Sequence, residues 1–177
     1  MTRLYFDSFY TAFGNFAIVW GHSEMIRKIY LPNRVGDLTR EYPSAELNIN
    51  SNIRSVIENI VKFLDGQDVR FGLEQVALDD CSCFQRKVLL AEHAIPRGFV
   101  STYQRIAERV GCPRGARAVG RALAANPFPV IIPCHRAVRS DGGLGGYQGG
   151  LEMKKRLLEM EGVSFIGEKA DMAKVYY

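Results

Sequence analysis

Long apolar runs are missing from this 177-residue sequence. No stretch approaches the roughly 18 consecutive apolar residues of a membrane-spanning helix. The N-terminus also lacks the basic region and hydrophobic core of a secretion signal. We therefore expect neither membrane insertion nor secretion, and a cytoplasmic location, or a nuclear one in a nucleated cell. The hydrophobic fraction of 47% is ordinary for a globular protein with a packed core and argues against disorder.

Cysteine is scarce, with four residues at Cys81, Cys83, Cys112 and Cys134. A chain of this size without a secretion signal is not expected to depend on disulfides, so all four are predicted to be thiols. The spacing of Cys81 and Cys83 matches no common zinc pattern, and only three histidines are present to complete a site. We expect no metal and no other cofactor.

Acidic residues are few in the second half of the chain. Residues 84–165 hold 13 Lys and Arg against 6 Asp and Glu, a net charge of +7, whereas the remaining residues carry −3. Such an asymmetry favours an anionic partner for the second half, of which nucleic acid is the usual one. A solvated basic face without a partner is the alternative at this point.

Strand-like segments separated by turn signals fill the first part of the chain, at residues 4–9, 16–20 and 25–31. A polar loop over residues 32–50 follows. Ser51 is predicted to cap a helix whose apolar residues recur at three- and four-residue steps up to Leu64. Residues 69–78 read as a further extended stretch. We expect a small antiparallel sheet with one covering helix over residues 1–80.

A second unit, residues 81–177, is predicted to be mainly helical. Ser82 and Ser101 each precede a Gln three residues later, the pattern of a helix-capping box. The second of these helices ends at Gly111, and another helix over 116–125 follows a tight turn. Two short helices in this arrangement predict a DNA-binding helix-turn-helix, although any helical hairpin with a Gly turn has the same pattern.

The third of these helices carries Arg117 and Arg121 among small residues such as Ala118 and Gly120. A helix with so little bulk can approach a DNA groove closely. Close packing against another helix is the alternative explanation of the small side chains.

Cys134 follows an apolar run, residues 130–132, which we interpret as a short buried strand. A thiol becomes a strong nucleophile as its thiolate, which a nearby base or positive charge favours, and His135 and Arg136 come next in the chain. A buried structural cysteine is the alternative. Glycine-rich residues 140–150 allow close backbone approach to a ligand. A last helix, 151–161, is predicted with Lys154 exposed and Gly162 as its stop.

Several motifs of residues 84–163 together resemble the O6-alkylguanine-DNA alkyltransferases, also called methylated-DNA–protein-cysteine methyltransferases. The motifs are Ser101-Thr102-Tyr103-Gln104, Ala116-Arg117-Ala118-Val119-Gly120, Asn126-Pro127, Ile132-Pro133-Cys134-His135-Arg136, Gly146-Tyr147-Gln148-Gly149-Gly150 and Glu161-Gly162. The resemblance implies an α+β fold: a small N-terminal antiparallel sheet with a helix, then a mainly helical, winged helix-turn-helix-like C-terminal domain.

The implied activity is direct-reversal DNA repair, in which an alkyl group moves irreversibly from O6 of guanine, and also from O4 of thymine, to Cys134. Each molecule would act once. The resemblance implies that His135, polarised by Glu161, takes the thiol proton through a water molecule, and that Tyr103 donates a proton to the ring N3 of the leaving guanine.

The resemblance also assigns residues to the base and to double-stranded DNA. Tyr147, Gln148 and Ala137 would bind the flipped base, Asn126 would act as a hinge, and the helix bearing Arg117, Ala118, Gly120 and Arg121 would lie in the minor groove. Arg117 would fill the gap left in the base stack. The family commonly has a small residue at the position of Gln148, so the larger side chain leaves the shape of the pocket and its tolerance of bulky adducts open. A monomer is expected.

Two other functions fit parts of the sequence. A non-catalytic DNA-binding or damage-sensing regulator would keep the helix-turn-helix but needs no nucleophile, so Cys134 argues against it. A papain-like cysteine hydrolase needs a distant histidine rather than an adjacent one and leaves the helix-turn-helix unexplained.

Overall fold

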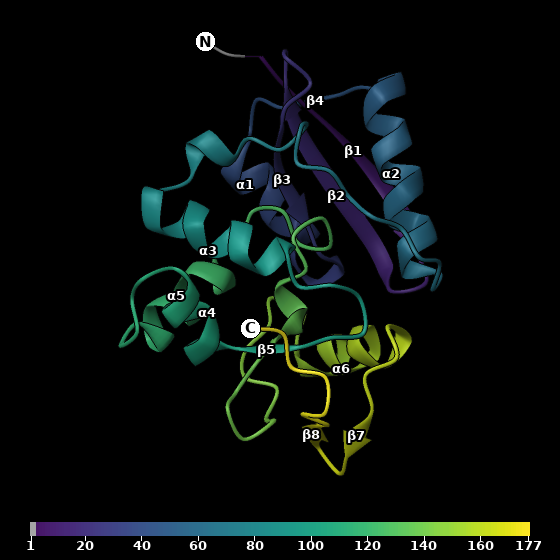
Figure 1. The fold of residues 1–177 in the computed structure, drawn as a ribbon. Coiled ribbons are helices and arrows are strands. Elements are labelled where there is room, and N and C mark those ends of the chain that lie inside the picture. The colour runs from purple at the N-terminus through teal and green to yellow at the C-terminus, as the bar shows by residue number, and fades with distance from the viewer. Residues whose placement is uncertain (1–2) are drawn as a thin grey trace. The chain divides into compact units, whose positions relative to one another are not determined.

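The computed structural model describes residues 3–177, which form two compact units. The first contains the chain up to Leu78 together with Pro127–Ile131, and the second contains Asp79–Asn126 and Ile132–Tyr177. Figure 1 traces the elements of both units in chain order. The predicted α+β fold class is confirmed. No helix within residues 3–177 is long and apolar enough to cross a membrane.

The first unit is built on an antiparallel sheet of three strands: β1 (Leu4–Thr11), β2 (Gly14–Gly21) and β3 (Ile26–Tyr30). A two-residue strand, β4 (Glu46–Leu47), adds to β1 in parallel, so the order is β3-β2-β1-β4. The three predicted strands are all present. Their buried residues alternate with more exposed ones only in part, because both faces of β2 are covered.

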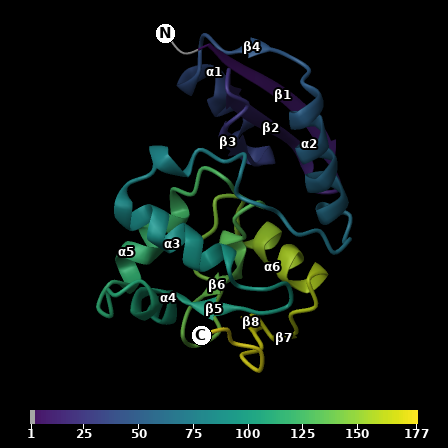
Figure 2. The same cartoon turned by 45° about the horizontal axis from the view of Figure 1, so that its top comes forward.

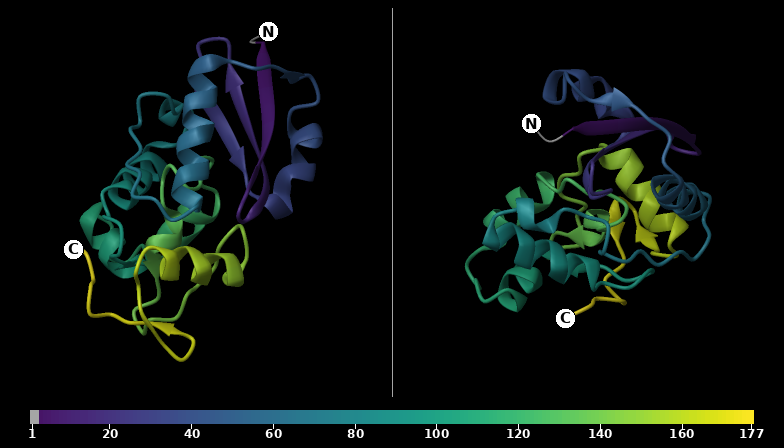
Figure 3. Two further views of the ribbon diagram at one scale, coloured as in Figure 1. Left: turned by 90° about the vertical axis from the view of Figure 1, so that its right-hand side faces the viewer. Right: turned by 90° about the horizontal axis from the view of Figure 1, so that it is seen from above.

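Two helical segments cover opposite faces of this sheet (Figure 3). On one face, the 3-10 helix η1 (Pro32–Asp37) and the short helix α1 (Leu38–Glu41) pack on Ala17 and Val19 through Leu38. On the other lies α2 (Ser51–Leu64), whose inward stripe is fully apolar. The stripe consists of Ile53, Ile57, Ile60, Phe63 and Leu64.

The predicted N-caps of two helices are each wrong by one residue. Asn50, not Ser51, caps α2, because its side chain accepts hydrogen bonds from two free amides of the first turn, those of Asn52 and Ile53. Thr102, not Ser101, caps the helix that follows it. Residues 69–78, predicted as a further extended stretch, lie outside the strands of the sheet, and Val76 makes an isolated parallel bridge with Ile26.

The second unit places three helices on one side of a short parallel pair of strands and a fourth helix on the other (Figure 2). The three are α3 (Cys83–His93), α4 (Tyr103–Arg109) and α5 (Ala116–Ala124), the strands are β5 (Ser101–Thr102) and β6 (Ala137–Val138), and the fourth helix is α6 (Leu151–Met160). The 3-10 helices η2 (Leu78–Asp80) and η3 (Cys134–Arg136) precede α3 and β6. A hairpin of β7 (Phe165–Ile166) and β8 (Lys169–Ala170) follows α6.

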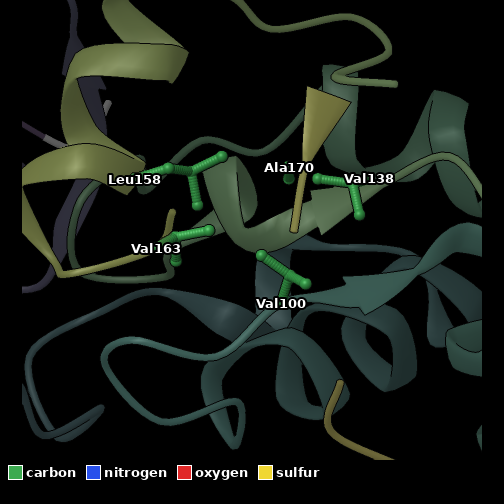
Figure 4. Packing of buried hydrophobic residues seen from close by; sticks show 5 residues of the cluster. All are labelled: Val100, Val138, Leu158, Val163 and Ala170. Atoms are coloured by element: carbon green, nitrogen blue, oxygen red, sulfur yellow. The ribbon is translucent and has the colours of Figure 1, made fainter. Parts of the chain in front are cut away.

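One apolar cluster ties these strands to α6 and the hairpin (Figure 4). Val100 leads into β5 and Val138 ends β6, while Leu158 lies on α6 and Val163 comes just after it. Ala170 of β8 closes the cluster. The elements that flank residues 134–137 and residue 161 are therefore held by one shared core.

The prediction of a strand before Cys134 is wrong. Residues 130 and 131 form a turn, and Val130 has φ +76°, a left-handed conformation that a β-branched residue rarely adopts. Its side chain is only 1% exposed, so burial of the apolar group offsets the backbone strain. Val130 and Ile131 are thus part of a buried turn that belongs to the first unit, whereas Ile132 belongs to the second.

Candidate active site and nucleic-acid interface

Cys134 is the buried member of the four cysteines, which are all free thiols. It opens η3 and is 5% exposed. Burial raises the pKa of the Cys134 thiol to about 12, although a hydrogen bond from the Asn126 side chain lowers it. The resting side chain is therefore a protonated thiol at neutral pH, and it needs a base before it can act as a nucleophile.

His135 and Arg136, the two residues after this thiol, form a closed network with Glu161. His135 Nε2 lies 2.7 Å from Glu161 Oε1. Arg136 donates to both carboxylate oxygens, from Nε at 2.8 Å and from Nη2 at 2.9 Å, and also donates from Nη1 to the carbonyl of Ile95. Such a bidentate fork fixes the carboxylate plane and so the histidine that it contacts.

The charge states of this network follow from its burial. Burial by itself would raise the pKa of Glu161, but His135 and Arg136 outweigh it and hold that pKa at about 2. Burial lowers the pKa of His135, against the opposing effect of Glu161. The imidazole is therefore neutral at pH 7 and donates from Nε2 to the carboxylate, which leaves Nδ1 as the ring nitrogen that can accept a proton.

The end of α6 explains why Glu161 is buried at this place. Gly162, with φ +90°, donates to the carbonyl of Glu159, and the amide of Val163 donates to the carbonyl of Leu158, each at 2.9 Å. These two bonds are a Schellman motif, and Leu158 and Val163 make its apolar contact. The predicted stop at Gly162 is confirmed, and it turns the chain directly after the carboxylate.

Lys154 was predicted to be exposed, and that prediction is wrong, since its exposed fraction is 0%. Its Nζ donates to the carbonyls of Ala137 at 2.6 Å, Gly146 at 3.2 Å and Leu144. It also lies 3.4 Å from Tyr103 Oη. The sequence held a signal for this position, because residue 154 shares one helix face with Leu157, Leu158 and Glu161 at steps of three, four and seven.

Tyr103, at the start of α4, packs against the glycine-rich segment. A Cβ on Gly145 would lie 2.6 Å from Tyr103 Oη, and Gly145 has φ +69°, so only glycine fits there. Burial raises the pKa of Tyr103 to about 12. Since the Tyr103 oxygen accepts from Lys154, its own proton is left to donate to another group.

The remaining residues predicted for the pocket also lie near Cys134. Gln148 Nε2 donates to the backbone carbonyl of Asn126 at 2.8 Å, and Asn126 Nδ2 donates to the carbonyl of Ile132 at 3.0 Å. The Tyr147 ring meets the His135 ring edge to face, with centroids 6.3 Å apart. Asn126 thus links the end of α5, the glycine-rich segment and the turn into Cys134.

The four residues predicted to bind DNA all lie on α5. Val119 and Leu123 face inward, whereas Arg117 and Arg121 are exposed one turn apart. Ala118 and Gly120 are partly buried, and a Cβ on Gly120 would lie 3.9 Å from the Tyr103 ring. The helix therefore presents two cations outward while it packs next to Tyr103. Within residues 3–177 no group of His, Cys, Asp and Glu could hold a metal ion.

The second unit matches the family model described as 6-O-methylguanine DNA methyltransferase, DNA binding domain, over residues 83–163. A methylated-DNA–protein-cysteine methyltransferase of Haemophilus influenzae is 30% identical over 98% of this chain and 95% of its own length. The chain belongs to the methylated-DNA–protein-cysteine methyltransferase family. A relative of the same name from Methanothermobacter thermautotrophicus is 49% identical over 66% of this chain and 65% of its own length.

A solved structure extends the likeness to both units. The crystal structure of Mycobacterium tuberculosis OGT in complex with DNA has a TM-score of 0.74 and 27% identity, covering 89% of this chain and 92% of that one. The predictions of a DNA repair methyltransferase family and of a DNA partner are thereby confirmed.

Proposed function

We propose that this chain transfers the alkyl group of O6-alkylguanine, and of O4-alkylthymine, from double-stranded DNA to Cys134, once per molecule and as a monomer. The observation that carries the proposal is a neutral imidazole, fixed by a carboxylate of depressed pKa, in the residue that directly follows the one buried thiol. A cysteine that served packing alone would not need an oriented base beside it.

The chemical step needs a proton acceptor and a proton donor. His135 Nδ1 takes the thiol proton through a water molecule, and Glu161 stabilises the imidazolium that forms. The Cys134 sulfur then forms a bond to the alkyl carbon while the bond from that carbon to O6 breaks. The electron pair stays on the guanine, and Tyr103 supplies a proton to ring N3, so the base leaves in its neutral form.

The target base reaches the thiol by rotating out of the duplex. Arg117 enters the base stack from the exposed face of α5, and Arg121 contacts phosphate, while Ala118 and Gly120 let the helix lie close to the minor groove. Tyr147 walls the base pocket. The backbone of Ala137 and the side chain of Gln148 bind the edge of the base, and Asn126 acts as the hinge between α5 and the Cys134 turn.

The mass of the intact protein after reaction with O6-methylguanine DNA tests this function. One methyl group replaces one hydrogen, so the mass should rise once, by about fourteen units, on the peptide that contains Cys134. Cys134→Ser should abolish the gain and leave DNA binding intact. Cys112→Ser, which removes a thiol outside the network, should react like the wild type. Repeated turnover, or methylation of another cysteine, would contradict the proposal.

A further inference from the structure

Glu92 is a fully buried carboxyl group that the chemistry above does not use. It lies near the end of α3, where Val88, Leu89 and Ala91 are also buried, and its exposed fraction is 0%. Neither of its oxygens makes a hydrogen bond of regular geometry within residues 3–177, although the backbone amide of Ala137 acts on Glu92 as a weak donor and lowers its pKa. Burial of an ionised carboxylate in this state is costly, so a residue of this kind needs a physical explanation.

The buried charges around Glu92 supply one. Arg136 and Lys154 are cations, whereas Glu161 and Glu92 are potential anions. Glu161 is occupied by the fork of Arg136. Lys154 directs its ammonium at backbone carbonyls and Tyr103, so Glu92 acts on it through space and not by an ion pair.

The charge of Glu92 affects the pKa of four groups on other elements: Tyr103 of α4, Cys134 of η3, Lys154 of α6, and Tyr177. Arg136, Glu161 and the backbone amide of Ala137 in turn affect the pKa of Glu92. A negative charge on Glu92 raises the pKa of both Cys134 and Tyr103, and for Cys134 this effect exceeds the opposite effect of Lys154.

The charge of Glu92 itself is poised near neutral pH. Burial raises the pKa of Glu92 to about 8, and Lys154, Arg136 and the Ala137 amide oppose the rise. Burial also lowers the pKa of Lys154 to about 8. At pH 7 Glu92 is therefore the neutral acid while Lys154 is charged. Because Arg136 is a cation and Glu161 an anion, these four buried groups together carry one positive charge in excess.

We propose that Glu92 is a positioning residue whose charge controls thiolate formation at Cys134. The neutral acid leaves an excess positive charge among the buried groups, and this charge favours the thiolate. The Glu92 anion cancels the excess charge and slows transfer. The inference rests on the proposed function. Glu92 keeps its proton during the reaction, and the thiol proton still passes to His135.

Glu92→Gln, which keeps the shape and removes the charge, tests the proposal. Single-turnover methyl transfer from O6-methylguanine DNA is measured for both proteins between pH 6.5 and 9.5. The ratio of variant to wild-type rate should be near one at the acid end and rise to about tenfold or more at the alkaline end, since each unit of thiol pKa changes the thiolate fraction tenfold. Glu159→Gln, which removes an exposed charge from α6, should give a flat ratio.

A rate ratio of variant to wild type that stays at one would overturn the proposal. A ratio below one at every pH would also overturn it, because Glu92 would then be an ionised partner that Lys154 requires.

Thermal unfolding gives a second measure of the charge of Glu92. Since the folded-state pKa lies above the unfolded one, the variant should gain melting temperature over the wild type as pH rises from about 4.5 to 8. A wild type that transfers no methyl group at any pH would sink the proposed function alone, as the melting measurement still reports the charge of Glu92.

Discussion

The carboxylate of Glu161 serves two partners, His135 and Arg136, and only the first contact belongs to the proposed chemistry. The second contact holds the carboxylate in place and contributes to stability, since a buried guanidinium without its carboxylate is expensive. A substitution of Glu161 therefore disturbs both, and a test of its role has to separate them.

Glu161→Gln should slow single-turnover transfer by about 10² to 10⁴, the usual range for loss of an acid–base component. Arg136→Lys is the matched control: it breaks the fork but leaves the contact of His135 with the carboxylate. That variant should lose stability and keep the rate within about tenfold, measured well below both melting temperatures. Equal rate losses in the two variants would mean that Glu161 acts only by supporting the fold.

Arg117 and Arg121 are both exposed on α5, so they form a pair in which one substitution controls for the other. Arg117→Ala should cripple transfer from a duplex, where unstacking costs a few kcal/mol, and barely affect reaction with free O6-benzylguanine. Arg121→Ala should weaken duplex binding. It should also reduce the slope of log binding constant against log salt concentration by about the amount that one phosphate contact contributes.

Equal losses on duplex and free base would show that Arg117 supports the pocket instead of the flipped state. The comparison requires a wild type that accepts free O6-benzylguanine. Gln148, whose side chain donates to the Asn126 carbonyl, is proposed to bind the edge of the base, so the wild-type rate with this bulky free base is measured first.

At the scale of elements, the sequence allowed the order of strands and helices to be predicted, because hydrophobic period and turn residues are local signals. Lys154 was misplaced because a charged residue is expected to face water, and its carbonyl partners come from segments that no local pattern brings together. Val130 was misread for a related reason: an apolar run predicts burial, but it does not distinguish a strand from a buried turn.

The candidate site was predicted more completely than the fold around it. Cys134, His135 and Glu161 could be proposed from motif spacing, and in the structure His135 contacts Glu161 while Cys134 is buried. Glu92 has no such signal, since an isolated Glu within a helix usually lies on its exposed face. Its burial depends on how α3 packs in the second unit, which is tertiary information.

Leu158 links the apolar cluster to the end of α6, so its side chain holds the segment that presents Glu161. Leu158→Ala should lower the free energy of unfolding by about 2 to 5 kcal/mol, the cost of a large core truncation. Leu151→Ala, at an exposed position of the same helix, should cost little. Chemical denaturation checks both, and similar midpoints for the two variants would contradict this role of the cluster.

The whole molecule should lose stability in acid through Glu161. Its folded-state pKa of about 2 lies below the ordinary value of 4.5, so its contribution is complete above pH 4.5 and is lost as pH falls toward 2. The difference corresponds to about 3 kcal/mol. Denaturation of wild type and Glu161→Gln should therefore converge over this window, and a constant gap between the two would refute the assignment.

Pro127–Ile131 belong to the first unit although the residues before and after them belong to the second. This arrangement affects how such proteins can recombine during evolution. Pro127 accepts a hydrogen bond from the amide of Ile29 in β3, although the two residues lie far apart in the chain. A recombination event that replaced residues 1–78 as one block would bring in a foreign β3 and leave its five-residue partner behind, a few positions before Cys134. The first unit is thus discontinuous in sequence. We expect substitutions at residues 127–131 to correlate with substitutions in β3 more closely than with substitutions in the neighbouring turn that contains Cys134.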